Sequence, residues 1–456
     1  MRNVDKYQSL LNILRWGKML IAIIIYILIL VCIGIYDSFK IKEFKDYAVA
    51  GKNQSFLRVF LSMMATIIGA SATIGVVERV TTIGFASFWW LGVGAIGLFF
   101  QSLLLSQKIR ELDANTLPDI ADKTIGTAGK NILAIVISVS WIGIIAAQFV
   151  SIAEIISVAL PSINRDILLI IISIIVIIYT IIGGQVSVIK TDSVQYCFIV
   201  IGILATVVYI FLTGENNADV ISKIEFFNKN FNVNDFISLL FITGGAYFLG
   251  PDIISRNLIA KDGKTAKKAT IASAITLLLF SFVITLIGLW AVVNISDEKL
   301  NAQNPLIYIM NNHVPYPLEI LLCVALLATL VSSVDTCMIN AASIIGHDLL
   351  KRKKVKEIRL IVGTVGILGL FIALLKDDII GLLSGAYSIY VPGIVCPLFI
   401  SIWFYKKKTI RKKLWFTAVI VGGLSGILHS YMGVGSEFLP LIGMGVSCLF
   451  SILSVL

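Results

Sequence analysis

Long apolar segments recur along the whole chain, and this pattern constrains the fold more than any other feature. A helix needs about 20 apolar residues to cross the hydrocarbon layer, so thirteen such helices use roughly 260 of the 456 residues. The chain is 58% hydrophobic and only 14% charged, which excludes a water-soluble fold. The sequence therefore predicts an all-α polytopic membrane protein with about thirteen spans, at residues 18–37, 58–76, 83–106, 132–160, 167–183, 191–213, 236–255, 269–294, 318–347, 358–375, 379–405, 414–432 and 438–455.

The net charge of +10 reflects how basic residues are distributed between these spans. Alternate connections hold 27 of the 37 Lys and Arg residues, whereas the opposite connections hold 6. By the positive-inside rule the 27 face the cytoplasm, so an odd number of spans places the N-terminus outside and the C-terminus in the cytoplasm. Arg2, Lys6, Arg15 and Lys18 conflict with this orientation, but six consistent connections outweigh one segment. The charge indicates topology in a plasma membrane and no nucleic-acid partner.

Two predicted spans contain residues that interrupt a helix near its midpoint. The span at 58–76 carries Gly69, Ala70 and Ser71, and the span at 236–255 carries Gly244, Gly245, Gly250 and Pro251. Weak points at corresponding positions of two five-helix halves are typical of transporters whose site lies between unwound segments. The alternative is that these glycines only allow close packing of helices.

Polar residues on the span at 318–347 favour the transporter interpretation. Thr329, Ser332, Ser333 and Thr336 are spaced to share one helix face, and Asp335 lies beside them. Oxygen ligands without a cluster of His or Cys suit a hard cation, and Na⁺ can use hydroxyls together with carbonyls from an unwound helix. The sequence therefore predicts a sodium site that involves this helix.

Two further carboxylates lie at predicted membrane depth. Asp192 follows Lys190 and Thr191 at the start of a span, where it either stabilises a helix N-terminus or takes part in function. Glu154 shares its span with Gln148, and carboxylates within a membrane tend to line transport pathways. We therefore favour a role for Glu154 in the transport pathway over a purely structural role.

Five motifs, in order, make the chain resemble the sodium:solute symporters, the family of the sodium/glucose, sodium/proline and sodium/pantothenate carriers. The resemblance covers nearly the whole chain. Three departures are Lys52 where Arg is usual, Thr329 where Ala is usual, and Asp335 where some members have a small residue. The motifs are DYAVAGKN from residue 46, IIGGQVSVIKTDSVQ from residue 181, PDIISRNLIAK from residue 251, ATLVSSVDT from residue 328 with HDLLKR from residue 347, and AYSIYVPGIVCPLFISIWFYKKKT from residue 386.

The resemblance implies the leucine-transporter architecture, in which ten core helices form two inverted repeats. The expected division is an N-terminal helix and loop at 1–57, a first repeat at 58–215, a second repeat at 216–405, and two C-terminal helices at 406–456. It also implies a carrier and not an enzyme, because coupling an ion to a solute requires no covalent chemistry.

The resemblance also implies where sodium binds. The main site would use backbone carbonyls of Ala65, Ile68 and Thr329 with the hydroxyls of Ser332 and Ser333. A second cation or proton site would use Asp192, Ser332, Asp335 and Thr336. Asp335 would strengthen, protonate or abolish that second site.

The expected function is sodium-coupled import of a small organic solute by alternating access. We favour an amino acid or small carboxylate, because free N–H groups at the first break attract an anionic group and other polar groups are few. The alternatives are a sugar or other polar solute, proton coupling, a channel, or a sensor built on a transporter fold. The candidate solute-binding residues are Gly69, Ala70, Ser71, Ala72, Gln148, Glu154, Tyr247, Gly250 and Asp252.

Overall fold

The computed structural model describes residues 2–160, 163–376, 378–430, 432–433 and 438–456, with side chains described from residue 17 onward except at 158–159. The side chains of Arg2, Lys6 and Arg15, which conflict with the predicted orientation, lie outside the described residues. The helices are α1 (Arg2–Ser38), α2 (Phe44–Val49), η1 (Ala50–Lys52), α3 (Phe56–Ile67), η2 (Ser71–Gly75), α4 (Val76–Ile83), η3 (Gly84–Phe88), α5 (Trp89–Leu104), α6 (Ser106–Glu111), α7 (Leu117–Thr124), α8 (Thr127–Ala159), α9 (Arg165–Thr213), α10 (Asn217–Ser222), α11 (Val233–Leu249), α12 (Pro251–Ile259), α13 (Gly263–Asn294), α14 (Asp297–Ala302), α15 (Pro305–Asn312), α16 (Tyr316–Ser343), η4 (Ile344–Leu349), α17 (Val355–Leu375), α18 (Ile379–Tyr390), η5 (Val391–Val395), α19 (Cys396–Trp403), α20 (Lys412–Ser430) and α21 (Leu439–Leu453).

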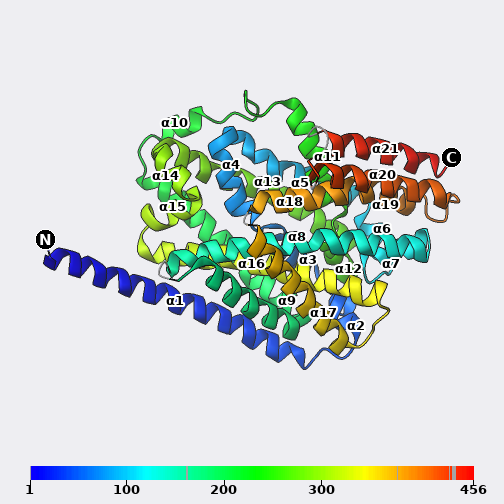
Figure 1. The fold of residues 1–456 in the computed structure, drawn as a ribbon, viewed down its shortest axis with the longest axis horizontal. Coiled ribbons are helices and arrows are strands. Elements are labelled where there is room, and N and C mark those ends of the chain that lie inside the picture. The colour runs from blue at the N-terminus through cyan, green and yellow to red at the C-terminus, as the bar shows by residue number, and fades with distance from the viewer. Residues whose placement is uncertain (1, 161–162, 377, 431, 434–437) are drawn as a thin grey trace.

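Helices occupy the positions of the predicted spans and run mostly along one direction of the molecule (Figure 1). Among the described residues, ten helical segments are long and apolar enough to cross a membrane, and the shorter apolar helices α3 and α21 accompany them. The start of α1 and the C-terminus lie at opposite ends of the structure, as an odd number of crossings requires (Figure 1). The prediction of an all-α polytopic membrane protein is confirmed.

Two predicted spans, 167–183 and 191–213, fall within the single 49-residue helix α9. The chain bends at Gly184, whose φ of 56° and ψ of −174° are not helical. Only glycine adopts this conformation readily. A side chain would also not fit there, because a Cβ atom on Gly184 would lie 2.7 Å from Cδ2 of Tyr47. The segment α9 therefore consists of two helices joined at a bend that glycine permits.

The second predicted span is broken, as the glycines at its midpoint indicated. Helix α3 ends where Ile68 leaves the helical region at ψ 86°, and the chain resumes in the π-helical turn η2 before α4. A third irregular turn, η5, separates α18 from α19 and contains Pro392. Proline lacks an N–H group and cannot continue regular helical hydrogen bonding, which accounts for the irregularity at η5.

The seventh predicted span breaks at Gly250 and Pro251. Gly250 is extended at ψ 136°, as expected before a proline, and Pro251 begins α12. Gly244 has a different role, because a Cβ atom there would lie 3.0 Å from the Val93 carbonyl oxygen of α5. Both interpretations of the glycines are therefore right, at different positions: Gly250 takes part in the break, and Gly244 permits close packing.

Helix α16 lies at the centre of the bundle. Every residue from Leu322 to Ser343 is buried, against α9, α8, α17 and α3. A helix buried on all sides has no face that must be apolar toward lipid or polar toward water, so its polar residues are free to serve a site. The centre of the bundle thus brings the hydroxyls of α16 against the break in α3.

Candidate functional site

The break after α3 frees backbone groups inside the bundle. The N–H of Gly69 binds the Ile67 carbonyl at 3.1 Å, and the N–H of Ala72 binds the Gly69 carbonyl at 3.2 Å. The regular helical acceptors of these two N–H groups, the carbonyls of Ala65 and Ile68, are therefore released. Gln148 of α8 accepts the Ala70 N–H at 3.1 Å, which likewise releases the Thr66 carbonyl.

Two serines of α16 approach the released carbonyls. The Ser332 hydroxyl lies 2.8 Å from the Ala65 carbonyl oxygen, and the Ser333 hydroxyl lies 3.0 Å from that of Thr66. Both hydroxyls also face the Thr329 carbonyl oxygen of their own helix, at 3.0 and 2.9 Å. A Cβ atom at position 69 would lie 2.7 Å from the Ser333 Oγ, so Gly69 permits this approach.

This cluster contains more acceptors than donors. The break releases three carbonyl oxygens, from Ala65, Thr66 and Ile68, whereas only two hydroxyls approach it and each hydroxyl has one proton. Burial makes an unsatisfied carbonyl costly, by about 1 to 3 kcal/mol. An oxygen-rich cluster that lacks protons and is shielded from water is suited to bind a hard cation.

A second cluster lies beside the first and is centred on Arg256 of α12. Its guanidinium is fully buried and lies 3.1 Å from the Asp192 carboxylate of α9. The same group donates hydrogen bonds to the hydroxyls of Thr66 and Thr336, at 2.7 and 2.5 Å. Arg256 therefore joins α3, α9, α12 and α16 just beyond the two helix breaks.

The charges in this second cluster do not balance. Ser62 donates to Asp192 at 2.5 Å, and Thr336 lies 3.4 Å from Asp335, so two buried carboxylates surround one guanidinium. One oxygen of Asp192 and one of Asp335 have no hydrogen-bond partner among the described residues. If both carboxylates are ionised, the cluster has one uncompensated negative charge.

These contacts correct two sequence-based interpretations. Asp192 lies well inside helical structure that resumes after Gly184, so it does not stabilise a helix N-terminus; it pairs with Arg256. Arg256 had been counted among the 27 basic residues of cytoplasmic connections, yet its exposure is 0%. Arg256 does not belong to a cytoplasmic connection. It can be buried because the internal Asp192 carboxylate compensates its charge.

A cavity of about 60 Å³ adjoins the first cluster. Of the predicted solute-binding residues, Gly69, Ser71, Gln148, Tyr247, Gly250 and Asp252 line it. The remaining three, Ala70, Ala72 and Glu154, are not among the lining residues, and Glu154 lies almost two helical turns beyond Gln148. The sequence reasoning did not select the other lining residues, which are Thr66, Ile67, Trp141, Ile144, Ala246, Ile253, Ser333, Cys337, Leu383 and Tyr387.

Two polar side chains in the cavity have unused hydrogen-bonding capacity. Asp252 accepts at one oxygen from the Trp141 indole at 2.7 Å and from Asn340 at 3.1 Å. Its other oxygen has only the Cys337 thiol, at 3.8 Å. Gln148 uses its carbonyl oxygen for the Ala70 N–H, and its amide nitrogen makes no hydrogen bond within the described part of the chain. Asp252 therefore offers a free acceptor and Gln148 a free donor to a solute, beside the hydroxyls of Ser71, Tyr247 and Tyr387 that also line the cavity.

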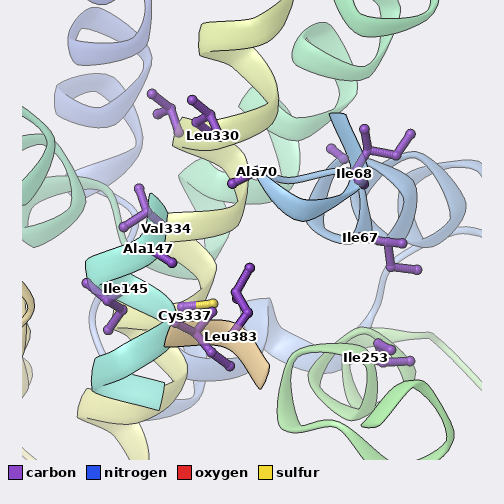
Figure 2. Close-up of a cluster of buried hydrophobic side chains, with 14 of the residues drawn as sticks. Ile67, Ile68, Ala70, Ile145, Ala147, Ile253, Leu330, Val334, Cys337 and Leu383 are labelled. Atoms are coloured by element: carbon purple, nitrogen blue, oxygen red, sulfur yellow. The ribbon is translucent and has the colours of Figure 1, made fainter. Parts of the chain in front are cut away.

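Apolar side chains from several helices hold this arrangement together (Figure 2). Ile67, Ile68 and Ala70 at the break belong to one buried cluster with Leu330 and Val334 of α16, and Ala70 lies beside Leu330. The same cluster includes Ile145 and Ala147 of α8, Ile253 of α12, Cys337 of α16 and Leu383 of α18. This apolar shell keeps water from the oxygen cluster, which strengthens its electrostatic interactions.

Solved structures share this fold. A sodium-coupled sialic acid symporter in a substrate-bound outward-open state aligns with a TM-score of 0.81 at 15% identity, covering 96% of this chain and 97% of that one. The structure of MhsT in complex with L-phenylalanine aligns with a TM-score of 0.61 at 12% identity, covering 89% and 99%. The fold is thus that of the leucine-transporter class of secondary carriers, built on a five-plus-five inverted repeat.

Sequence comparisons identify the family. The chain matches the Sodium:solute symporter family over residues 47–419. Among curated relatives, the sodium/glucose cotransporter of Vibrio parahaemolyticus is 25% identical, over 97% of this chain and 88% of that protein. The osmoregulated proline transporter OpuE of Bacillus subtilis is also 25% identical, over 77% and 75%. The chain belongs to the sodium:solute symporter family. It is a multi-pass membrane symporter that couples sodium to an organic solute, and not an enzyme.

The Arg256 cluster predicts a specific pattern of stability. Arg256→Gln should destabilise the protein by about 3 to 5 kcal/mol, because it leaves two buried carboxylates without their counter-charge. Adding Asp192→Asn should recover part of the loss, since one of those charges is then removed. Thermal unfolding of the purified single and double variants in detergent measures both effects.

Arg58→Gln, at an exposed position on α3, is the matched control and should change stability little. Equal unfolding midpoints for Arg256→Gln and wild type, or additive losses in the double variant, would contradict the ion pair.

Proposed function

We propose that the oxygen cluster at the end of α3 is the main sodium site. Its predicted ligands are the carbonyl oxygens of Ala65, Ile68 and Thr329 and the hydroxyl oxygens of Ser332 and Ser333. The two hydroxyls contact the carbonyls of Ala65, Thr66 and Thr329, and the break releases the Ile68 carbonyl. The observation that carries this proposal is the excess of carbonyl acceptors over hydroxyl protons in a buried cluster. When the two hydroxyls rotate their protons away, their lone pairs face the same point as the carbonyls.

Sodium in this position links α3 to α16. The ligands come from the broken helix and from the central helix, so the ion favours the conformation in which these elements are in contact. Ser333 also lines the solute cavity, and Gly69 lies within the break and at the cavity wall. Ion and solute therefore stabilise a common arrangement, and their binding is reciprocally coupled. Each inward Na⁺ contributes about 2.3 kcal/mol per 100 mV of membrane potential.

The double variant Ser332→Ala with Ser333→Ala tests this site. Loss of both hydroxyls should raise the Na⁺ concentration for half-maximal binding by at least about tenfold, since ligand–cation contacts are charge-assisted and exceed about 1.5 kcal/mol each. Binding of radioactive Na⁺ to the purified protein measures this without knowledge of the solute.

Thr329→Val is the matched control, because the Thr329 hydroxyl bonds only to the Leu326 carbonyl at 2.7 Å and the backbone carbonyl remains. Unchanged Na⁺ affinity in the serine double variant would refute the assignment, as would an equal loss in the valine variant.

We infer that the second site, comprising Asp192, Ser332, Asp335 and Thr336, holds a proton and not a second sodium ion. Arg256 supports this choice, because its guanidinium already contacts Asp192 and Thr336 as an internal cation. The Ser332 hydroxyl faces the first cluster instead. One proton on the carboxylate pair neutralises the remaining charge without another ion.

Asp335→Asn separates the two possibilities. The substitution keeps the shape and removes the ionisable group, so a protonated Asp335 predicts one bound Na⁺ per chain in both proteins, measured by equilibrium dialysis. We also expect proton release on Na⁺ binding to differ between them. A fall from two bound ions to one in the variant would show that the second site is a sodium site.

We propose an amino acid as the solute, with a small carboxylate as the wider class. The free oxygen of Asp252 suits an ammonium group, and the amide nitrogen of Gln148 suits a carboxylate. At about 10 to 15 Å³ for each water-sized group, a cavity of about 60 Å³ admits only a small solute. Relatives include both proline and glucose carriers, and a hexose has about twelve heavy atoms and no charged group to match the Asp252 carboxylate, so it fits this small cavity less well.

Asp252→Asn tests the solute class. A panel of amino acids, small carboxylates and sugars is screened by thermal shift with NaCl or choline chloride, because ligands that bind the folded state raise its stability. We expect amino acids to stabilise the wild type only with Na⁺, and the variant to need at least about tenfold more solute. Asp166→Asn, at an exposed position on α9, should behave as wild type. If only sugars stabilise the protein, and Asp252→Asn does not change that stabilisation, the sugar alternative is favoured.

We further propose that the N-terminus is outside, the C-terminus is cytoplasmic, and the repeats occupy 58–215 and 216–405. The remaining 26 loop basic residues support this orientation after Arg256 is set aside from the 27. Helices α2 and α6 lie toward the end where the C-terminus is found (Figure 1), and Lys42 and Lys45 at α2 are exposed.

A further inference from the structure

An apolar groove of about 360 Å³ lies between α5, α11, η5, α19 and α21, apart from the solute cavity. Phe100 and Phe241 in its walls are 49% and 47% exposed, and Phe399 and Met444 form another part of the lining. In a membrane-spanning bundle, an apolar opening of this kind faces hydrocarbon, so its natural occupant is an acyl chain.

Aromatic residues connect this groove to a cluster of lysines. The Phe399 ring lies 5.9 Å from the ring of Trp403, which ends α19 one turn later. The Lys108 ammonium lies 3.3 Å from the Trp403 ring centroid, and that of Lys407 lies 5.6 Å from it. The Lys408 ammonium lies 5.8 Å from the Phe404 ring. We call Lys108, Lys407 and Lys408 the lysine cluster. Groove and lysine cluster are therefore adjacent along α19.

The positive charge of the lysine cluster is not compensated within the protein. Across the residues whose positions are described, no carboxylate forms an ion pair with any of the three lysines. Lys407 and Lys408 are exposed, and Lys108 is partly buried against Trp403. Burial, and after it the neighbouring charge of Lys407, lower the pKa of Lys108.

We propose that the groove and the lysine cluster form one binding site for an anionic phospholipid. An acyl chain occupies the groove, and the phosphate lies at the lysine cluster above Trp403. Basic residues next to a membrane surface contribute attraction to anionic lipids, by about 1 kcal/mol each. The positive-inside rule explains excess charge in this connection, but it does not explain an apolar groove that ends at the same aromatic residue.

The position of the groove ties this site to the moving parts of the carrier. Gly244, Gly245 and Phe248 of α11 line it just before the break at Gly250, and Val395 of the irregular turn η5 lines the opposite side. A bound acyl chain therefore contacts two interrupted helices. The proposal is independent of the sodium and solute sites, because none of its lining residues belongs to them.

Native mass spectrometry of delipidated protein tests the proposal with phosphatidylglycerol and phosphatidylcholine of the same acyl chains. Wild type should bind phosphatidylglycerol more tightly. The triple variant Lys108→Gln, Lys407→Gln and Lys408→Gln should weaken that binding by at least about tenfold, as loss of three lysine contributions implies. The control Lys351→Gln, Lys353→Gln and Lys354→Gln removes the same charge from another exposed basic connection and should change it less than about threefold.

Two further measurements separate a lipid site from a simple anion site. Leu240→Trp partly fills the groove and should also weaken phosphatidylglycerol binding, while glycerol phosphate without acyl chains should bind far more weakly than the lipid. Equal losses in both triple variants, equal binding of phosphatidylcholine, or equal binding of glycerol phosphate would overturn the proposal. Radioactive Na⁺ binding, which uses none of these residues, verifies that each variant is folded.

Discussion

The rest of the structure depends on one constraint: backbone groups released inside a membrane protein must find partners. Where α3 ends, the carbonyls of Ala65, Thr66 and Ile68 lose their regular helical donors, and water is not available to replace them. Helix α16 supplies two hydroxyls and α8 supplies Gln148. The same release underlies the sodium site that we propose, because the available protons are fewer than the carbonyls. The same side chains therefore hydrogen-bond to the released carbonyls when sodium is absent and join them as ligands when sodium is bound.

Arg256 extends this arrangement to the second break. It lies on α12, five residues after Pro251, and contacts Thr66 two residues before the end of the helical geometry in α3. A shift of either interrupted helix changes the distance from the guanidinium to Asp192 or to Thr66. Because the pair is buried, such a change is energetically costly, and the two breaks are expected to move together. This gives a physical route for coupling that does not require the ion and solute to touch.

The sequence predicted the parts of the site that follow from spacing. Of the four hydroxyl residues at helical intervals on α16, Ser332 and Ser333 meet the carbonyls released at the break, whereas Thr336 contacts Arg256 and the Thr329 hydroxyl bonds within α16. Arg256 was within a recognised motif, yet its burial was missed because only the fold brings α12 against Asp192 on α9. Trp141 and Tyr387 in the cavity were missed because an aromatic residue within an apolar span gives no sign of its direction, and tertiary packing directs both toward the cavity. Glu154 shows the converse error, since a carboxylate on the same helix as Gln148 need not reach the same cavity.

The internal guanidinium also bears on the energetics of transport. A sodium ion that crosses with the solute gains about 2.3 kcal/mol per 100 mV, which alone sustains a gradient of roughly 50-fold for a neutral solute. Arg256 occupies the second cluster as a fixed charge and never crosses, so it organises the carboxylates without adding to this driving force. A proton that remained on Asp335 through the cycle would also add none, whereas one released inside would couple uptake to the proton gradient. The protonation of Asp192 and Asp335 therefore decides whether the chain couples one ion or two to the solute. The broken helices determine only which ion occupies the first site.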